Sequence, residues 1–221
     1  MRKISKPSTA QCNLEHYTLF LLSEPKHGGC SRLAEILGDV SHDSVNRFLL
    51  RERYEPKDLF DIVTGIINLK GGILSVDDTV IEKLYSNPLY AELISYFWSG
   101  KYHKTIKGLN LITIFYQPDD ENPQEVLQQI SRSEFITIHD THWGIESFHR
   151  AVKQLCGICR FMVRDSHAIK THIFCALQAF IRLEKMRSEN VISNWYEVQR
   201  NLFTKVIREY VLDNLSATCA A

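Results

Sequence analysis

Apolar residues recur at helical spacing in four segments of the first 70 residues. The segment 13–23 predicts a first helix, because Leu14, Tyr17 and Leu21 fall on one face and Asn13 can cap it. Segments 31–37 and 41–50 predict two short helices that are joined by a tight turn. Segment 57–69 predicts a fourth helix, which Pro56 suits as its first turn and a glycine pair ends. Its expected inward-facing residues are Leu59, Phe60, Val63, Ile66 and Ile67.

The second and third of these helices have the arrangement of a helix-turn-helix, with Gly38 in the turn and Ser41 as the cap of the third helix. Their expected small core is Leu33, Ile36, Leu37, Val45, Phe48 and Leu49. The other side chains of the third helix are candidates for contacts to a DNA groove or to phosphates: His42, Asp43, Ser44, Asn46 and Arg47. An ordinary solvated helix is the alternative interpretation of the same pattern.

After residue 70 the pattern changes to strands. Segment 73–76 predicts a short buried strand that ends at Asp77 and Asp78, and segment 109–116 predicts a second, strongly apolar strand. Carboxylates at the end of a central strand suit a Mg²⁺-dependent nuclease, because a sheet holds oxygen ligands rigidly. Aspartates also end strands as ordinary turn residues, so both interpretations stay open.

A further helix is expected to begin at Asp140, which is a natural cap. Its core-facing residues are Ile145, Phe148, Val152 and Leu155, and its opposite face carries His142, Glu146, His149, Arg150 and Lys153. Glu146 and Lys153 stand seven residues apart, so a carboxylate for a metal lies on the same side as a cation for a phosphate. The alternative is an amphipathic helix with solvated charges. Segments 166–187 and 194–212 predict two more amphipathic helices.

Charge changes this picture only locally, because 26 Lys and Arg balance 26 Asp and Glu over the 221 residues. Residues 150–187 hold an excess of basic residues, and a second basic cluster consists of Lys101, His103, Lys104 and Lys107. Residues 119–146 are strongly acidic. The chain shows neither a membrane-spanning segment nor a signal peptide, so we expect a cytoplasmic protein.

Six cysteines without secretory context are expected to be free thiols. Cys156 and Cys159 have the spacing of half a zinc site or of a redox pair, but no second ligand pair has suitable spacing. Buried thiols at a helix end are therefore the favoured interpretation.

Two of these motifs carry a resemblance to the DDE-type transposases of bacterial insertion sequences. The segment 76–79, Val-Asp-Asp-Thr, resembles the one that bears their first catalytic aspartate, which matches Asp78. The stretch from Trp143 to Lys153 resembles their signature around the catalytic glutamate, which matches Glu146 and has a lysine seven positions later. Where many members carry a tyrosine and an arginine before the glutamate, this chain has His139 and His142.

The resemblance implies an RNase H-like catalytic domain in which three carboxylates hold two Mg²⁺ (or Mn²⁺) ions and cut and transfer DNA strands. Asp78 and Glu146 would bind metal, and Lys153 would hold a phosphate. Only 68 positions separate Asp78 from Glu146, which is shorter than the family's pattern, and the second aspartate is missing from a matching strand. Asp119, Asp120 and Asp140 are candidates to replace it, but each lies in predicted loop or cap sequence.

The sequence therefore predicts a helix-rich α+β protein in three parts. Residues 1–70 would form a DNA-binding region with a helix-turn-helix, 71–165 a shortened RNase H-like (α/β) region, and 166–221 C-terminal helices. The expected function is that of a transposase-like DNA-binding protein, an enzyme only if the metal site is complete. The expected partners are transposon ends, target DNA and a second copy of the chain. Residues expected to contact DNA are Ser44, Asn46, Arg47, Lys104 and Arg150.

Two alternatives belong to other classes. One is a non-catalytic helix-turn-helix protein that competes for transposon ends. The other is an unrelated hydrolase whose carboxylates only mimic the pattern.

Overall fold

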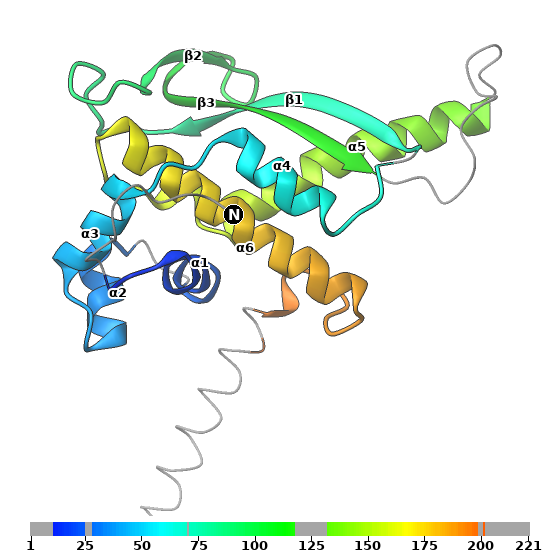
Figure 1. The fold of residues 1–221 in the computed structure, drawn as a ribbon. Helices are drawn as coiled ribbons and strands as arrows, with labels where there is room; N and C mark the ends of the chain where they lie inside the picture. The colour runs from blue at the N-terminus through cyan, green and yellow to red at the C-terminus, as the bar shows by residue number, and fades with distance from the viewer. Residues whose placement is uncertain (1–10, 25–27, 70, 118–131, 199–200, 202–221) are drawn as a thin grey trace, which may run out of the picture.

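The fold was analysed in a computed structural model, which describes residues 11–24, 28–69, 71–117, 132–198 and 201 (Figure 1). For residues 117 and 132–142 it describes the backbone alone. In this part of the chain, four helices are followed by three consecutive strands of one antiparallel sheet and then by further helices, which confirms the predicted α+β class. No helix in the described ranges has the length and apolar character that a bilayer span requires.

Helix α1 (Leu14–Ser23) begins as predicted, because the Asn13 side chain accepts a hydrogen bond from the backbone N–H of His16. Helices α2 (Cys30–Leu37) and α3 (His42–Arg51) follow, with Gly38 at a positive φ of 73° in the turn between them. The Ser41 side chain caps α3 by accepting from the backbone N–H of Ser44. Two short helices joined by a glycine turn are therefore present where the sequence predicts them.

The predicted core of this helix pair is correct for Leu33, Val45, Phe48 and Leu49, which are buried. Ile36 is half exposed, so its expected inward position is wrong. Helix α4 (Pro56–Thr64) begins at the predicted proline but ends five residues before Leu69. Phe60 and Ile66, which were expected to face inward, expose more than half of their surface. With a free outer face, α4 gains little from burial, and the extra turn is not formed.

The sheet has the strand order β1-β3-β2, and both pairs are antiparallel. Strand β1 (Ile73–Glu82) continues six residues past the predicted end, and β3 (Lys104–Gln117) begins five residues before the predicted start. Strand β2 (Ser95–Ser99) was not predicted. Leu74 and Val76 are exposed, so β1 is not buried on both faces as expected.

Helix α5 (Arg132–Gln154) starts eight residues before Asp140, so that residue lies inside the helix and does not cap it. It packs against β1 and β3. The short turn η1 (Ile158–Arg160) leads to α6 (Ser166–Ser188), which Asp165 caps by accepting from the backbone N–H groups of His167 and Ala168. The predicted helix 194–212 lies mostly outside the described residues.

A single hydrophobic cluster joins the regions that the sequence separates at residues 70 and 165. It contains Leu21 of α1, Leu49 of α3, Ile81 of β1, Val152 of α5 and Leu183 of α6. Helix α6 occupies the centre of this arrangement, since α1, α3 and α5 all pack against it. In Figure 1 the sheet runs along the top, α5 and α6 lie beneath it, and α1 to α3 occupy the lower left. The site positions therefore share one rigid core.

Candidate functional site

The two motif segments that carry the transposase resemblance lie side by side. Lys153 on α5 donates a hydrogen bond from Nζ to Thr79 Oγ1 on β1 at 2.5 Å, across 74 positions of sequence. One turn earlier on α5, His149 Nδ1 lies 3.5 Å from Asp77 Oδ2. Its Nε2 lies 3.3 Å from Thr113 Oγ1 on β3. A polar cluster of Asp77, Thr79, Thr113, His149 and Lys153 thus connects α5 to the sheet.

The carboxylate that faces α5 is Asp77, one position before the predicted metal ligand. Neighbouring residues of a strand point to opposite faces, so Asp77 shares a face with Thr79 and the fully buried Ile81. Asp78 shares the other face with Leu74 and Val76, and all three are exposed. The structure therefore places Asp78 away from the contacts that join Lys153 and His149 to β1.

Glu146 is exposed on α5, and Arg150 is exposed one turn later, as the sequence predicts. His149 was expected on the same solvated face but is buried, with only 5% of its surface exposed. The burial lowers the pKa of His149, while the nearby Asp77 carboxylate raises it and the Lys153 ammonium lowers it again. The net shift lowers the pKa of His149, which favours its neutral form in a polar layer between helix and sheet.

Among the described side chains of this region, the carboxylates do not gather into the three-carboxylate set that the resemblance implies. Among the residues that the structure describes, no three His, Cys, Asp or Glu side chains converge closely enough to hold a metal ion. Asp77 lies beside the His149 imidazole, a ligand type that suits Zn²⁺ better than Mg²⁺. The Lys153 ammonium is bonded to Thr79, which is two residues further along β1 on the same face. Asp119 and Asp120, and the side chain of Asp140, lie outside the described residues.

Two of the five residues expected to contact DNA are exposed on α3. Asn46 and Arg47 face solvent, as do His42 and Asp43. Ser44 does not: its side chain is fully buried, and its Oγ accepts from the backbone N–H groups of Gln11 and Cys12. The prediction that Ser44 faces a DNA groove is therefore wrong, because the chain before α1 packs over it.

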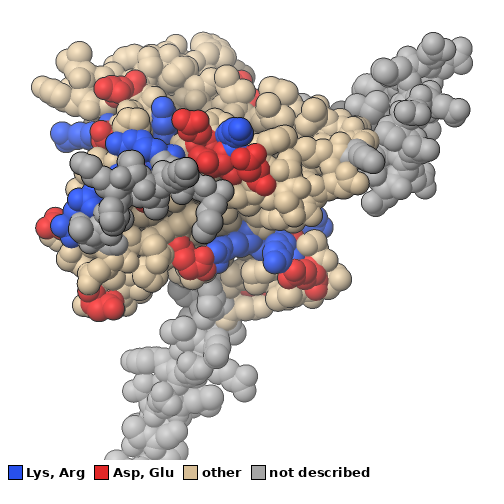
Figure 2. Space-filling view, viewed as in Figure 1, with Lys and Arg blue, Asp and Glu red and all other residues tan. Residues whose placement is uncertain are grey.

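Basic residues elsewhere do not gather into one broad area on the visible face. Lys104 is exposed at the start of β3. Figure 2 shows Lys and Arg interspersed with Asp and Glu over the face seen there. Along α6 several basic residues are paired: Arg182 with Glu15, Lys185 with Glu189, and Arg187 with Glu184. Part of the excess in residues 150–187 is thus neutralised within the molecule.

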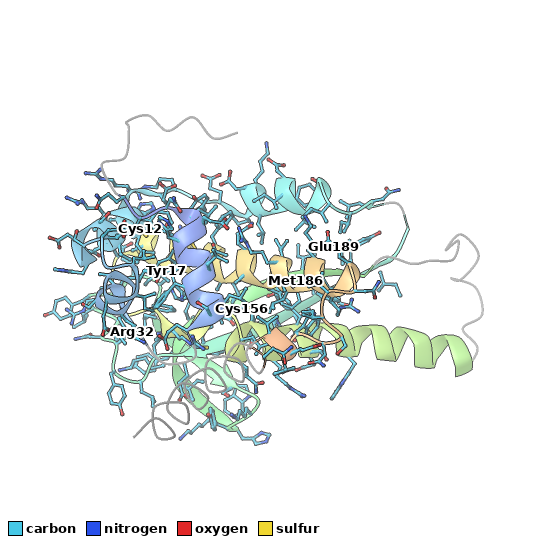
Figure 3. The ribbon with its side chains drawn as sticks, turned by 90° about the horizontal axis from the view of Figure 1, so that it is seen from below. Cys12, Tyr17, Arg32, Cys156, Met186 and Glu189 are labelled. Atoms are coloured by element: carbon cyan, nitrogen blue, oxygen red, sulfur yellow. The ribbon has the colours of Figure 1, made fainter. Side chains whose placement is uncertain are left out.

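The described cysteines are free thiols, of which Cys12, Cys156 and Cys175 are buried. Cys12, Cys30, Cys156, Cys159 and Cys175 are free. Burial raises the pKa of Cys156 to about 12, so its thiol stays protonated and does not bind metal in that form. In Figure 3, Cys156 and Tyr17 are seen among the side chains between the helices. Of the 156–159 pair, Cys156 is buried as expected and Cys159 is partly exposed. Cys219 lies outside the described residues.

Comparison with known proteins adds no relationship to this geometry. No family model, no curated protein and no solved structure matches this chain.

Proposed function

We propose that this chain is a transposase-like DNA-binding protein of an insertion sequence, and that it holds DNA ends without cutting them. The observation that carries the proposal is the helix pair α2–α3. Its apolar side is buried, while Asn46 and Arg47 point to solvent from the second helix. A helix of this kind fits the major groove, where Asn reads adenine and Arg reads guanine or a phosphate.

A second observation favours descent from a transposase. The segment around Asp78 and the segment from Trp143 to Lys153 are the two that resemble the family, and they are in contact through Lys153 and Thr79. The contact supports a shared origin, and the position of Asp78 on the other face of β1 favours binding over cleavage.

Binding to duplex DNA at low salt is the first test, because phosphate contacts are strongest there. We expect the full chain to retard a labelled duplex and its affinity to fall as salt rises. Replacing one phosphate-contacting cation should reduce the slope of log affinity against log salt by about 0.9. Arg47→Gln is expected to do so, whereas Lys57→Gln on α4, which removes the same charge elsewhere, should not. Absence of any duplex binding at low salt would refute the proposal.

Cleavage is tested on the same duplex with Mg²⁺ or Mn²⁺. We expect binding without nicking. Nicking by the intact chain that is lost in Asp78→Ala, but kept in Asp77→Ala, would show that the enzyme is competent and that the carboxylate assigned by resemblance is the functional one. Asp77→Ala as the more damaging change would instead assign the metal to the face toward α5.

A further inference from the structure

The hairpin of β2 and β3 carries a surface that the proposed function does not use. Tyr96 lies opposite Lys107, and Trp98 lies opposite Thr105. Residues two apart on a strand point to the same face, so the two aromatic side chains share one face, together with their cross-strand partners. Tyr96 and Trp98 expose 63% and 65% of their surfaces, while Ser99 and Ile106 are buried. The hairpin thus buries other side chains and presents two large rings to solvent.

The spacing of these rings suits stacking on bases. Side chains two residues apart on a strand are separated by about 6.8 Å, which is about twice the 3.4 Å rise per base of DNA. One base can therefore lie between the two rings, or one against each. Because Tyr and Trp side chains have only two χ angles each, the rings lose little conformational freedom when a base stacks on them. Exposed aromatic residues grouped in this way mark an interaction surface.

The charge around the rings selects an anionic partner. Between Ser95 and Gln117 the sequence contains no Asp or Glu, and it contains Lys101, Lys104 and Lys107. Lys107 is the direct cross-strand neighbour of Tyr96. Lys101 Nζ lies 5.0 Å from the centre of the Tyr102 ring in the turn between the strands. Aromatic faces for bases and ammonium groups for phosphates are thus interleaved on one hairpin.

We infer that the β2–β3 hairpin binds single-stranded DNA, with Tyr96 and Trp98 stacked on unpaired bases and with Lys107, on the same face, and Lys101, in the turn, contacting the phosphates. Unpaired bases are required, because the faces of bases inside a duplex are already stacked on each other. Stacking reads no base edge, so the hairpin binds without strong sequence preference. The surface is separate from α3, and it remains testable if the proposed duplex binding fails.

Fluorescence anisotropy of labelled oligothymidine with the full chain tests the inference, since this strand forms no duplex. Loss of one stacked base weakens binding roughly 5- to 150-fold. We expect a loss in that range for Trp98→Ala and for Tyr96→Ala. Trp98→Phe should keep most of the affinity, whereas Trp98→Leu, which keeps an apolar side chain without a flat ring, should lose it. Equal affinity of the Phe and Leu variants would overturn the stacking model.

The phosphate contacts have their own measurement. Replacing Lys101 and Lys107 by glutamine should reduce the salt slope for the single strand by about 1.4, since each contact contributes about 0.7. Duplex binding by Arg47→Gln and by Trp98→Ala separates the two proposals: Arg47→Gln should affect the duplex, and Trp98→Ala the single strand. Unchanged single-strand binding in Trp98→Ala, together with loss of a dimer in sedimentation, would show that the rings contact a second copy and would refute the inference.

Discussion

Burial fixes the protonation of His172, which joins three parts of the core. Its Nδ1 lies 2.9 Å from Tyr17 Oη on α1, and its Nε2 lies 3.1 Å from the carbonyl oxygen of Gly157. A carbonyl can only accept, so Nε2 carries the proton and Tyr17 donates to Nδ1. The desolvation of this fully buried ring lowers its pKa to about 4. A neutral imidazole is therefore part of the folded state.

This pKa shift predicts a loss of stability in mild acid. His172 binds a proton near pH 6.5 in the unfolded chain and only near pH 4 in the folded chain. The stability that neutral His172 gives to the folded state is therefore fully present above pH 6.5 and is lost as the pH falls toward 4. At pH 5 the loss is about 2 kcal/mol relative to pH 7.5. Urea unfolding at both pH values measures it. His172→Gln, which cannot titrate, should show a smaller drop, and an equal drop in both proteins would contradict the assignment.

Lys83 gives a pH dependence of the same sign as His172, but in the alkaline range. Its Nζ donates to the carbonyl oxygens of Cys159 and Phe161 at 2.7 and 2.6 Å, and it lies over the Phe161 ring. Burial lowers its pKa to about 8, so between pH 8 and 10.5 the unfolded chain binds more protons than the folded chain. Stability conferred at this residue therefore rises over that range. The free energy of unfolding of the natural chain, minus that of Lys83→Met, should increase from pH 8 to pH 10.5. A constant difference would show that Lys83 does not titrate in this range.

At the scale of elements, the spacing of apolar residues predicted the positions of the helices better than their first and last residues. Helix α3 and its serine cap were predicted from Ser41 and the apolar spacing alone. The start of α5 was not, because Asp140 resembles a cap although the helix continues through it. Strand β2 was missed because its five residues carry no clean alternation of polar and apolar types.

Gly108 sets how closely β1 and β3 approach. A Cβ at this position would lie 2.4 Å from the carbonyl oxygen of Ile81, a backbone atom that cannot move without disturbing the strand pair. Gly108→Ala is therefore expected to destabilise the protein by about 1 to 3 kcal/mol. Gly100→Ala is a matched control, since nothing lies within 4 Å of its added Cβ. Chemical denaturation of both variants measures the effect, and equal stability of the two would contradict the close approach.

At the scale of the whole molecule, one core makes the described parts of the chain interdependent. Phe180 on α6 contacts Phe148 on α5 in an edge-to-face pair with centroids 4.8 Å apart, and it contacts Trp195 at 5.1 Å. The resulting cluster extends from α1 to the segment after α6. Regions that look separable in the sequence are therefore expected to unfold together.

Phe180→Ala tests this cooperativity. Removal of a buried phenylalanine costs about 3 to 5 kcal/mol. We expect that loss together with a single transition in which fluorescence and circular dichroism coincide. Phe60→Ala, at an exposed position on α4, should change stability by less than about 0.5 kcal/mol. Two separate transitions, with only one moved by Phe180→Ala, would show that the parts fold independently.

The sequence by itself determined the elements with strong periodicity and strong caps, because hydrophobic spacing and capping act over a few residues. The sequence also predicted that the segments around Asp78 and Lys153 belong to one site, but only through the resemblance to transposases. Which aspartate faces α5 was decided by tertiary structure alone. In β1 both faces carry apolar residues, so alternation does not tell them apart, and a shift of one position moves every side chain to the other face. The burial of Ser44 and His149 likewise depends on which distant segment packs over them, and no local pattern encodes that.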